Sequence, residues 1–278
     1  MVPENQRSVS GSCAAASAVA EDPGPTPALE LDGLTRTFGG VTAVNGVSLR
    51  IHGGERLAVI GPNGAGKTTL FRLIAGEMPP TAGRVHLFGR DVTRLPAHRR
   101  ARLGLSRTFQ VSNLFAELSV ADNVRLAAQA DDRARMRFWW PSTSRDRSVA
   151  PVDAMLEQVG LWARRHDYVA NLSHGEKRQL EIGMALVAGP RLLLLDEPAA
   201  GLSGGERTRL RTLIEGLPSD LPILLIEHDM TLALDLSDRV LCLDNGVPIS
   251  LGAPDAVRND PRVQAVYLGR ARGDAEGS

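Results

Sequence analysis

The sequence predicts an α/β fold built on a mainly parallel sheet, and three observations support this. A buried strand at Glu55–Ile60 runs directly into a glycine-rich loop, and an apolar helix follows at Leu70–Ala75. Two more short apolar segments, Leu192–Leu195 and Ile223–Ile226, are bounded by charged residues or proline. Near-continuous apolar runs of this length are typical of strands that are covered by other elements on both faces.

The order of the other segments indicates one folded unit. Residues 1–27 are rich in Ser, Ala, Gly and Pro and bury too little apolar surface to order themselves, so we expect a disordered tail. The folded pattern begins near Leu29, and Val41–Ile51 predicts a strand. Residues 99–170 form a more helical and more polar block, in which 131–147 is expected to be a loop or insertion. No internal repeat is present, so the chain is not a fused pair.

A hairpin is predicted towards the C-terminal end. Val240–Leu243 and Val247–Leu251 flank Asp244-Asn245-Gly246. An Asn-Gly pair between two apolar segments is a strong signal for a tight turn between antiparallel strands.

Composition narrows the possible functions. The chain has 278 residues, of which 43% are hydrophobic, enough for one large domain with its own core. Its 32 basic and 32 acidic residues cancel, which argues against a nucleic-acid partner.

Cys13 and Cys242 match no metal-binding spacing, and we expect Cys242 in the core. No apolar segment approaches the roughly 20 residues of a membrane helix. The segment Cys13–Ala20 lacks the basic start and apolar middle of a secretory signal.

The glycine-rich loop has the chemistry of a phosphate site. Residues 61–68 match the pattern G-x-x-x-x-G-K-[ST] between a predicted strand and a predicted helix. Glycines let the backbone N–H groups approach an anion closely, and a helix N-terminus adds a favourable dipole. Lys67 would neutralise the β- and γ-phosphates, and the Thr68 hydroxyl would bind Mg²⁺. The predicted nucleotide-binding residues of this phosphate-binding loop are Gly61, Pro62, Asn63, Gly64, Ala65, Gly66, Lys67, Thr68 and Thr69.

Two other strands end in residues suited to a metal ion and a water molecule. Asp196 follows the apolar run at 192–195 and could hold Mg²⁺ together with Thr68. Glu197 could orient or deprotonate the attacking water. The alternative, a strand that merely ends in a polar turn, is common and is weakened only by the phosphate-binding loop. His228 follows Ile226-Glu227 and could hold the water in line, although a helix cap or a surface histidine would give the same pattern.

Together these motifs form an ordered set that resembles the ATP-binding subunits of ABC transporters. The resemblance covers roughly Leu29 to Gly269. It includes an aromatic residue, the phosphate-binding loop, a glutamine in Arg107-Thr-Phe-Gln110, a signature-like segment Asn171-Leu-Ser-His-Gly-Glu176 and the Asp196-Glu197 pair. The turn Pro198-Ala-Ala-Gly-Leu202 and His228 follow in the expected order.

The resemblance implies a domain plan. We expect a P-loop NTPase core with a mainly parallel sheet, an N-terminal antiparallel β part and an inserted helical subdomain at about 108–185. The ATP-binding domain would span 28–270, with a further short tail at 271–278.

The resemblance also implies roles for single residues, with ATP and Mg²⁺ as ligands. Phe38 would stack on adenine, unless it is a core aromatic. Gln110 would contact Mg²⁺ and the water and would relay the nucleotide state to the helical block. Ser173 and Gly175 would contact the γ-phosphate bound to an opposite subunit, because two such chains arranged head to tail trap two ATP molecules. The implied catalytic residues are therefore Glu197, His228 and Gln110.

The signature segment departs from the usual Leu-Ser-Gly-Gly-Gln of the family. His174 keeps its backbone N–H but adds a ring, and Glu176 places a negative charge where the family has an amide. That charge would weaken binding of the opposite phosphate by repulsion. The assignment of Ser173 and Gly175 is affected less.

Within the family, the chain is similar to the branched-chain amino-acid uptake group, with urea or short amides as the alternative cargo. The similarity lies in residues 172–183, 192–201 and 252–269. It implies two permease partners, a second ATPase subunit in a homo- or heterodimer, and an external binding protein. It also implies a position at the cytoplasmic face of the membrane. The basic, aromatic segment around Phe138-Trp139-Trp140 would face the permease or lipid headgroups, or else fold back on the domain.

Two functions of other classes remain as alternatives. An ABC-type protein acting on nucleic acid or ribosomes often has two cassettes or strongly basic segments, whereas this chain has one cassette and no net charge. A nucleotide-binding regulator with little hydrolysis would not need both Glu197 and His228. We therefore expect an ATPase coupled to transport.

Overall fold

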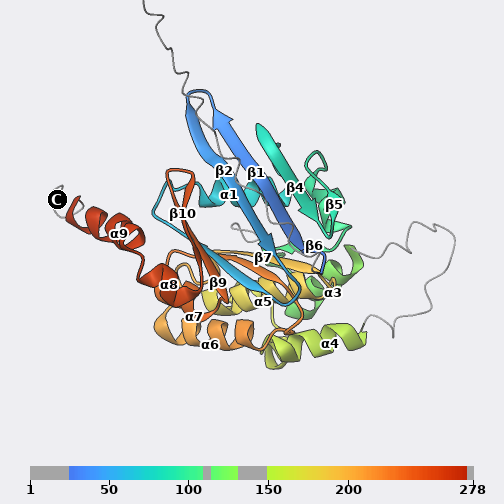
Figure 1. The fold of residues 1–278 in the computed structure, drawn as a ribbon. Helices are drawn as coiled ribbons and strands as arrows, with labels where there is room; N and C mark the ends of the chain where they lie inside the picture. The colour runs from blue at the N-terminus through green and yellow to red at the C-terminus, as the bar shows by residue number, and fades with distance from the viewer. Residues whose placement is uncertain (1–24, 109–113, 131–148, 274–278) are drawn as a thin grey trace, which may run out of the picture.

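The fold was analysed in a computed structural model that describes residues 25–108, 114–130 and 149–273. Two sheets form its centre (Figure 1). A four-stranded antiparallel sheet has the order β2-β1-β4-β5. Its strands are β1 (Leu29–Phe38), β2 (Val41–Ile51), β4 (Ala82–Leu87) and β5 (Arg90–Asp91).

The second sheet has six strands in the order β10-β9-β3-β8-β7-β6. All its neighbours are parallel except β10, which runs antiparallel to β9. The mainly parallel sheet and the N-terminal antiparallel part are therefore confirmed. The strands are β3 (Arg56–Ile60), β6 (Leu105–Arg107), β7 (Leu192–Asp196), β8 (Ile223–Ile226), β9 (Arg239–Asp244) and β10 (Val247–Gly252).

Helices lie on both faces of the six-stranded sheet (Figure 1). They are α1 (Lys67–Ala75), α2 (Ala97–Ala101), α3 (Val120–Ala130), α4 (Val149–Gln158), α5 (His174–Leu186), α6 (Gly204–Glu215), α7 (Met230–Asp235), α8 (Pro254–Arg258) and α9 (Pro261–Gly273), with 3-10 turns at Trp162–Arg164 and Val169–Asn171. Among the described helices, none is both long enough and apolar enough to cross a bilayer.

Alternate residues of the parallel strands enter two separate cores. Leu192 and Leu194 of β7 pack with α1 and the antiparallel sheet. Leu193 and Leu195 pack in the other core, which contains apolar residues of α3, α4, α5 and α6. All four side chains are fully buried. Burial on both faces explains why these strands are continuous apolar runs, as the sequence predicts.

Several sequence predictions agree closely with the structure. The strand at Val41–Ile51 has the predicted bounds, and Cys242 is fully buried. The hairpin turn has positive φ at Asn245 (46°) and Gly246 (79°), which matches the twist of adjacent strands. The helix expected at Leu70–Ala75 begins earlier, at Lys67, because Gly66 in a left-handed conformation already starts it. Residues 1–24 of the tail expected at 1–27 lie outside the described residues, as does the insertion at 131–147 with Phe138, Trp139 and Trp140.

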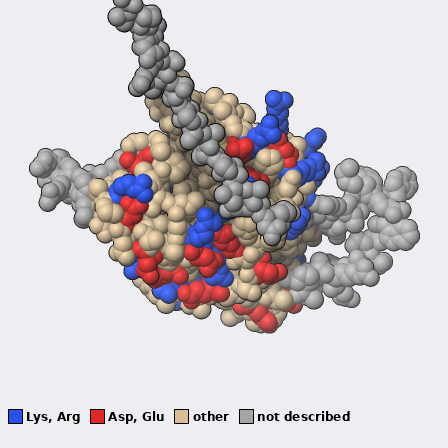
Figure 2. Space-filling view, in the orientation of Figure 1, with Lys and Arg blue, Asp and Glu red and all other residues tan. Residues whose placement is uncertain are grey.

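Charged side chains of both signs are interspersed over the lower part of the surface seen in Figure 2. On α6, Arg211 pairs with Glu215 and Asp235 at 2.8 Å each, and Arg207 pairs with Asp229 at 3.1 Å. Such exposed pairs contribute little to stability, so the two apolar cores hold the fold together.

Candidate active site

The phosphate-binding loop joins β3 to α1 and needs glycine for packing as well as for conformation. Gly61 and Gly66 have φ of 147° and 99°. A Cβ on Gly61 would lie 2.2 Å from the carbonyl oxygen of Leu243, and one on Gly66 would lie 2.2 Å from that of Ala43. Gly64 also has positive φ, but a Cβ there would meet nothing within 4 Å. The loop is therefore held against β2 and β9, while its crest at Gly64 is open to a ligand.

The start of α1 is suited to an anion. Among the described residues, no side chain caps this helix, and its first turn has no acidic residue. The Lys67 side chain is 4% exposed and folds over the loop, where its Nζ donates to the carbonyl oxygens of Gly61 (2.6 Å) and Pro62 (2.9 Å). Uncapped N–H groups and a buried ammonium group concentrate positive potential at one point.

Asp196 ends β7 at the same edge of the sheet. Asp196 and Val59 of β3 both pair with Ile226 of β8, so Asp196 is level with the strand that leads into the loop. The Asp196 side chain is 1% exposed, and neither carboxylate oxygen has a hydrogen-bond partner within the described part of the chain. Arg107 is its ion-pair partner, with 3.5 Å between Nη2 and Oδ2. Burial raises the pKa of this carboxyl, although Arg107 partly opposes the shift.

Glu197 and His228 meet beside Asp196. His228 Nε2 lies 2.6 Å from Glu197 Oε1, and both side chains are partly exposed, at 43% and 17% respectively. Glu197 has a φ of 46°, an uncommon conformation for a residue with a side chain. The structure thus brings together the two residues that the sequence predicts to act on the water.

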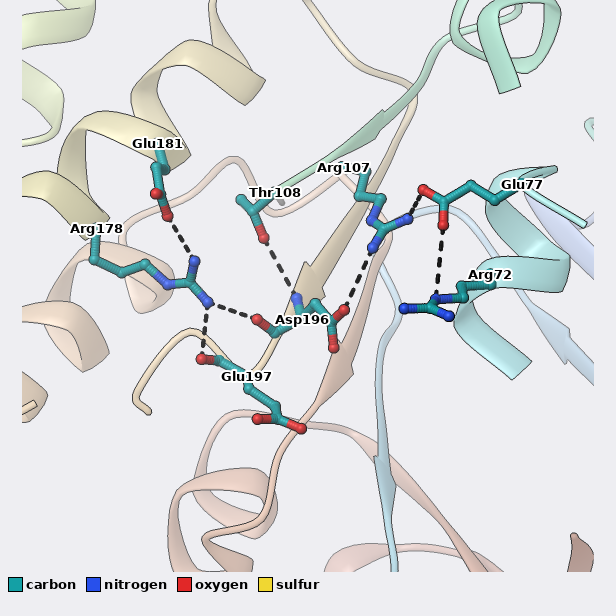
Figure 3. Close-up of polar contacts among 8 residues, drawn as sticks. All are labelled: Arg72, Glu77, Arg107, Thr108, Arg178, Glu181, Asp196 and Glu197. Atoms are coloured by element: carbon teal, nitrogen blue, oxygen red, sulfur yellow. Dashed lines mark hydrogen bonds and ion pairs between the residues drawn. The ribbon is translucent and has the colours of Figure 1, made fainter. Parts of the chain in front are cut away.

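Two arginines that sequence reasoning missed surround this edge (Figure 3). Arg107 lies against the Phe71 ring, 4.7 Å from its centroid, and connects Asp196 with Glu77. Arg178 of α5 donates to the backbone carbonyl oxygens of the last residue of β7 and of the two residues after it. No local pattern marks either residue, because their partners are distant in the sequence and are mostly backbone atoms.

Glu227 is a third residue without a sequence signal. Its side chain is 2% exposed and accepts the N–H of Ala199 at 2.9 Å. Burial raises the pKa of Glu227. It therefore helps to hold the turn at 198–202 against the end of β8.

The signature segment contacts a carboxylate of its own chain. Ser173 caps α5, and its partner in the capping box is Glu176, which accepts the Ser173 N–H at 2.8 Å. Glu206 accepts the Gly175 N–H at 3.0 Å and the Ser173 hydroxyl at 3.3 Å. Hydrogen bonds from Ser203, Gly175 and Ser173 lower the pKa of Glu206 to about 2. The donors expected to bind an opposite phosphate therefore already accommodate an oxyanion.

The two departures in the signature have structural consequences. Glu176 lies 3.2 Å from Arg164, which offsets the repulsion expected from its charge. The His174 ring reaches the carbonyl oxygen of Ala200, with 3.3 Å between Nε2 and O. Position 174 therefore connects the signature segment to the turn after Glu197.

Phe38 lies at the surface, with 44% of its side chain exposed and Arg36 stacked at 4.6 Å from the ring centroid. The core-aromatic alternative is therefore wrong. Phe38 pairs with Val41 at the β1–β2 hairpin, two residues before Ala43, which touches the phosphate-binding loop. Gln110 lies outside the described residues. The described chain stops two residues earlier at Thr108, whose hydroxyl accepts the Asp196 N–H at 3.3 Å.

Comparison with known proteins identifies the family of the chain. The ABC transporter family model matches residues 44–200. The model for the branched-chain amino acid ATP-binding cassette transporter matches residues 248–272. The high-affinity branched-chain amino acid transport ATP-binding proteins BraF of Pseudomonas aeruginosa and LivG of Escherichia coli are each 40% identical to the chain over 252 residues. Each alignment covers 88% of this chain and 99% of the relative.

Solved structures give the same result. The ATP-binding cassette MJ1267 of an ABC transporter superposes with a TM-score of 0.77 at 27% identity, covering 87% of this chain and 98% of that one. The fold and the site define an ATP-binding cassette, and the chain belongs to the ABC transporter family. Within the family, it groups with the ATP-binding proteins of branched-chain amino acid transport, as the sequence predicts.

Proposed function

We propose that this chain hydrolyses ATP to drive an ABC importer of branched-chain amino acids. The observation that carries the proposal is the position of Asp196, Glu197 and His228 at the sheet edge that also bears the phosphate-binding loop. Support for the cargo comes from the two 40% identical relatives, which are named as branched-chain amino acid transport proteins.

The residues present fit a magnesium ion. Asp196 offers two buried oxygens without hydrogen-bond partners in the described chain, and burial makes its charge costly unless a cation compensates it. Asp196, Thr68 and Gln110 are the proposed residues for holding the ion. When bound, it would neutralise charge on the phosphate oxygens.

The side chains around the phosphates have separate tasks. The loop amides and Lys67 bind the phosphates, and Phe38 offers an exposed ring for the adenine. Glu197 accepts a proton from the attacking water or orients it, and His228, 2.6 Å away, keeps the carboxylate and the water in place. Stabilisation of charge and positioning of water account for most of the catalysis in phosphoryl transfer.

A second subunit completes the site in this proposal. Ser173 and Gly175 would bind the γ-phosphate on the opposite subunit, and the carboxylate of Glu206 at these donors supports their capacity to bind an oxyanion. Glu206 would have to withdraw as the phosphate enters. Loss of the γ-phosphate then removes a bridge between subunits and shifts the pair towards an open state.

A largely apolar groove beside the site offers a surface for the permease. It has a volume of about 440 Å³ and is lined by Glu77, Arg107, Thr108, Leu114 and Met184, among others. Arg107 connects it directly to Asp196. A permease helix in this groove would report on the nucleotide, and it would keep the chain at the cytoplasmic face of the membrane.

Reconstitution tests both the activity and the cargo. The chain would be assembled in vesicles with its permeases and second ATPase subunit, and hydrolysis of Mg-ATP would be measured with external binding protein. We expect leucine, isoleucine or valine on the binding protein to stimulate phosphate release. Stimulation by urea or short amides alone would favour the alternative cargo, and absence of magnesium-dependent phosphate release would contradict the proposal.

A further inference from the structure

Arg178 makes an unusual set of contacts from the second turn of α5. Its Nη2 donates to the carbonyl oxygens of Asp196 (2.5 Å) and Glu197 (2.8 Å), and its Nε donates to that of Pro198 (3.1 Å). Its Nη1 lies 2.6 Å from Glu181, and both side chains are about nine-tenths buried. One guanidinium group thus holds three consecutive carbonyls where β7 turns into the next loop, and Figure 3 shows the two contacts with Asp196 and Glu197.

The held segment contains the strained residue of the site. Glu197 has a φ of 46°, in the left-handed region that residues with a Cβ seldom adopt. Such a conformation persists only where neighbouring contacts impose it. The Glu197 N–H donates to Ile226 at 2.9 Å, and its carbonyl accepts from Ala200 at 3.1 Å as well as from Arg178. Arg178 is therefore one of three polar contacts that fix this backbone.

The helix that carries Arg178 also connects it to the signature segment. The helix that bears it begins at the signature segment, where Ser173 is the N-cap. The second turn of α5 thus holds the Glu197 backbone of the same chain, while its first turn faces the position proposed for the opposite nucleotide. A shift of this helix when the subunits close would move Arg178 and the carbonyls that it holds.

We propose that Arg178 is a positioning residue, which holds Glu197 in its catalytic conformation and couples it to occupancy of the signature segment. This inference rests on the proposed function. Loss of the guanidinium leaves three consecutive carbonyls without this donor group, and the Glu197 backbone relaxes away from left-handed φ. Its carboxylate then no longer meets His228 and the water, whereas the phosphate-binding loop is unaffected.

The experiment measures kcat and KM for ATP in the assembled transporter, with the Arg178→Ala and Arg178→Lys variants. We expect Arg178→Ala to lower kcat roughly 10- to 100-fold, as a misplacement of about 1 Å does. KM should change less than about threefold. Arg178→Lys should recover part of kcat, because an ammonium group keeps the charge and some donors but lacks the planar fork. Should Arg178→Ala assemble poorly, the lysine variant carries the test alone.

Gln179→Ala is the matched control. Gln179 neighbours Arg178 on α5 but donates to the carbonyl oxygen of Val159, at 3.0 Å, instead of to the carbonyls that Arg178 holds. We expect this variant to keep the wild-type kcat. An equal fall in kcat for Gln179→Ala and Arg178→Ala would show a general effect of a damaged helix and would overturn the proposal.

A double-mutant comparison separates positioning from structure. In a Glu197→Gln background, Arg178→Ala should lower the residual hydrolysis less than about twofold, because the carboxylate that it positions is already absent. A further tenfold fall in that background would contradict the inference, and so would a wild-type kcat for Arg178→Ala. In either case an active wild-type complex would leave the proposed function intact.

Discussion

At the scale of the residue, Asp196 is a group whose burial costs folding free energy in the nucleotide-free protein but suits the proposed binding of a cation. Its carboxylate is buried and its two oxygens lack hydrogen-bond partners within the described chain. In the nucleotide-free protein, the ion-pair partner of this carboxylate is Arg107 at 3.5 Å, and Arg178 and Arg72 add weaker electrostatic compensation. A cation with phosphate is the natural complement of such a group.

We predict that Asp196→Asn stabilises the nucleotide-free protein and abolishes magnesium-dependent turnover. Burial raises the pKa of Asp196 above its unfolded value, so the ionised form destabilises the fold as pH rises through the folded-state pKa. The variant should melt roughly 2–4 °C higher at pH 7, the shift that about 1 kcal/mol causes in a domain of this size.

Thermal unfolding over a range of pH provides the check. The difference between variant and wild type should shrink as pH falls through the folded-state pKa to below the usual aspartate range, where Asp196 is protonated in both states. A variant that is less stable than wild type at pH 7 would show that the charge is compensated better than the geometry indicates.

At the scale of the element, α1 is held at both ends by groups of different character. Its first turn has no side-chain cap and no acidic residue among the described residues, while its last turn is capped by Gly76 and by the buried side chain of Arg100. Arg100 donates to the carbonyl oxygens of Leu73 (2.7 Å) and Ile74 (2.8 Å), and also to Thr93 and Leu95. Burial lowers the pKa of Arg100 to about 10, so it remains charged at neutral pH.

We predict that Arg100→Met lowers the free energy of unfolding by about 2–4 kcal/mol, because several buried carbonyls lose their donors. Arg100→Lys should recover only part of the loss, since one ammonium group cannot reach all four oxygens. Urea unfolding measures both variants. A change below about 0.5 kcal/mol for Arg100→Met would mean that water replaces the guanidinium at no cost.

The sequence predicts the strands and the phosphate-binding loop, but it does not predict the long-range side-chain contacts that hold these elements in position. Strands such as 192–196 follow from apolar runs that end in charge, and the phosphate-binding loop follows from fixed glycine spacing. Arg100, Arg107 and Arg178 carry no such signal, because an arginine that donates to distant carbonyls has the same local pattern as one in solvent. The exposure of Phe38 also depends on how the sheets pack, so the sequence left its two alternatives open.

At the scale of the whole molecule, each chain carries two different half-sites. The phosphate-binding loop lies at the end of β3, whereas the signature segment opens α5 and contacts Glu206 of α6. A head-to-tail pair would place each signature segment over the loop of the other chain. The proposed dimer is head to tail because the phosphate-binding loop and the signature segment are separate elements of one chain, so that each completes a site with its counterpart in the other chain.

The most direct test is to compare wild type with Glu197→Gln in the assembled transporter, following both phosphate release and the association of ATP-binding subunits. With Mg-ATP, we predict that the variant releases phosphate roughly 10²–10⁴ times more slowly. Its two ATP-binding subunits should stay closed around unhydrolysed ATP, whereas wild type reopens. Equal rates of phosphate release for the two proteins, or a variant whose subunits reopen with Mg-ATP as wild type does, would contradict the account.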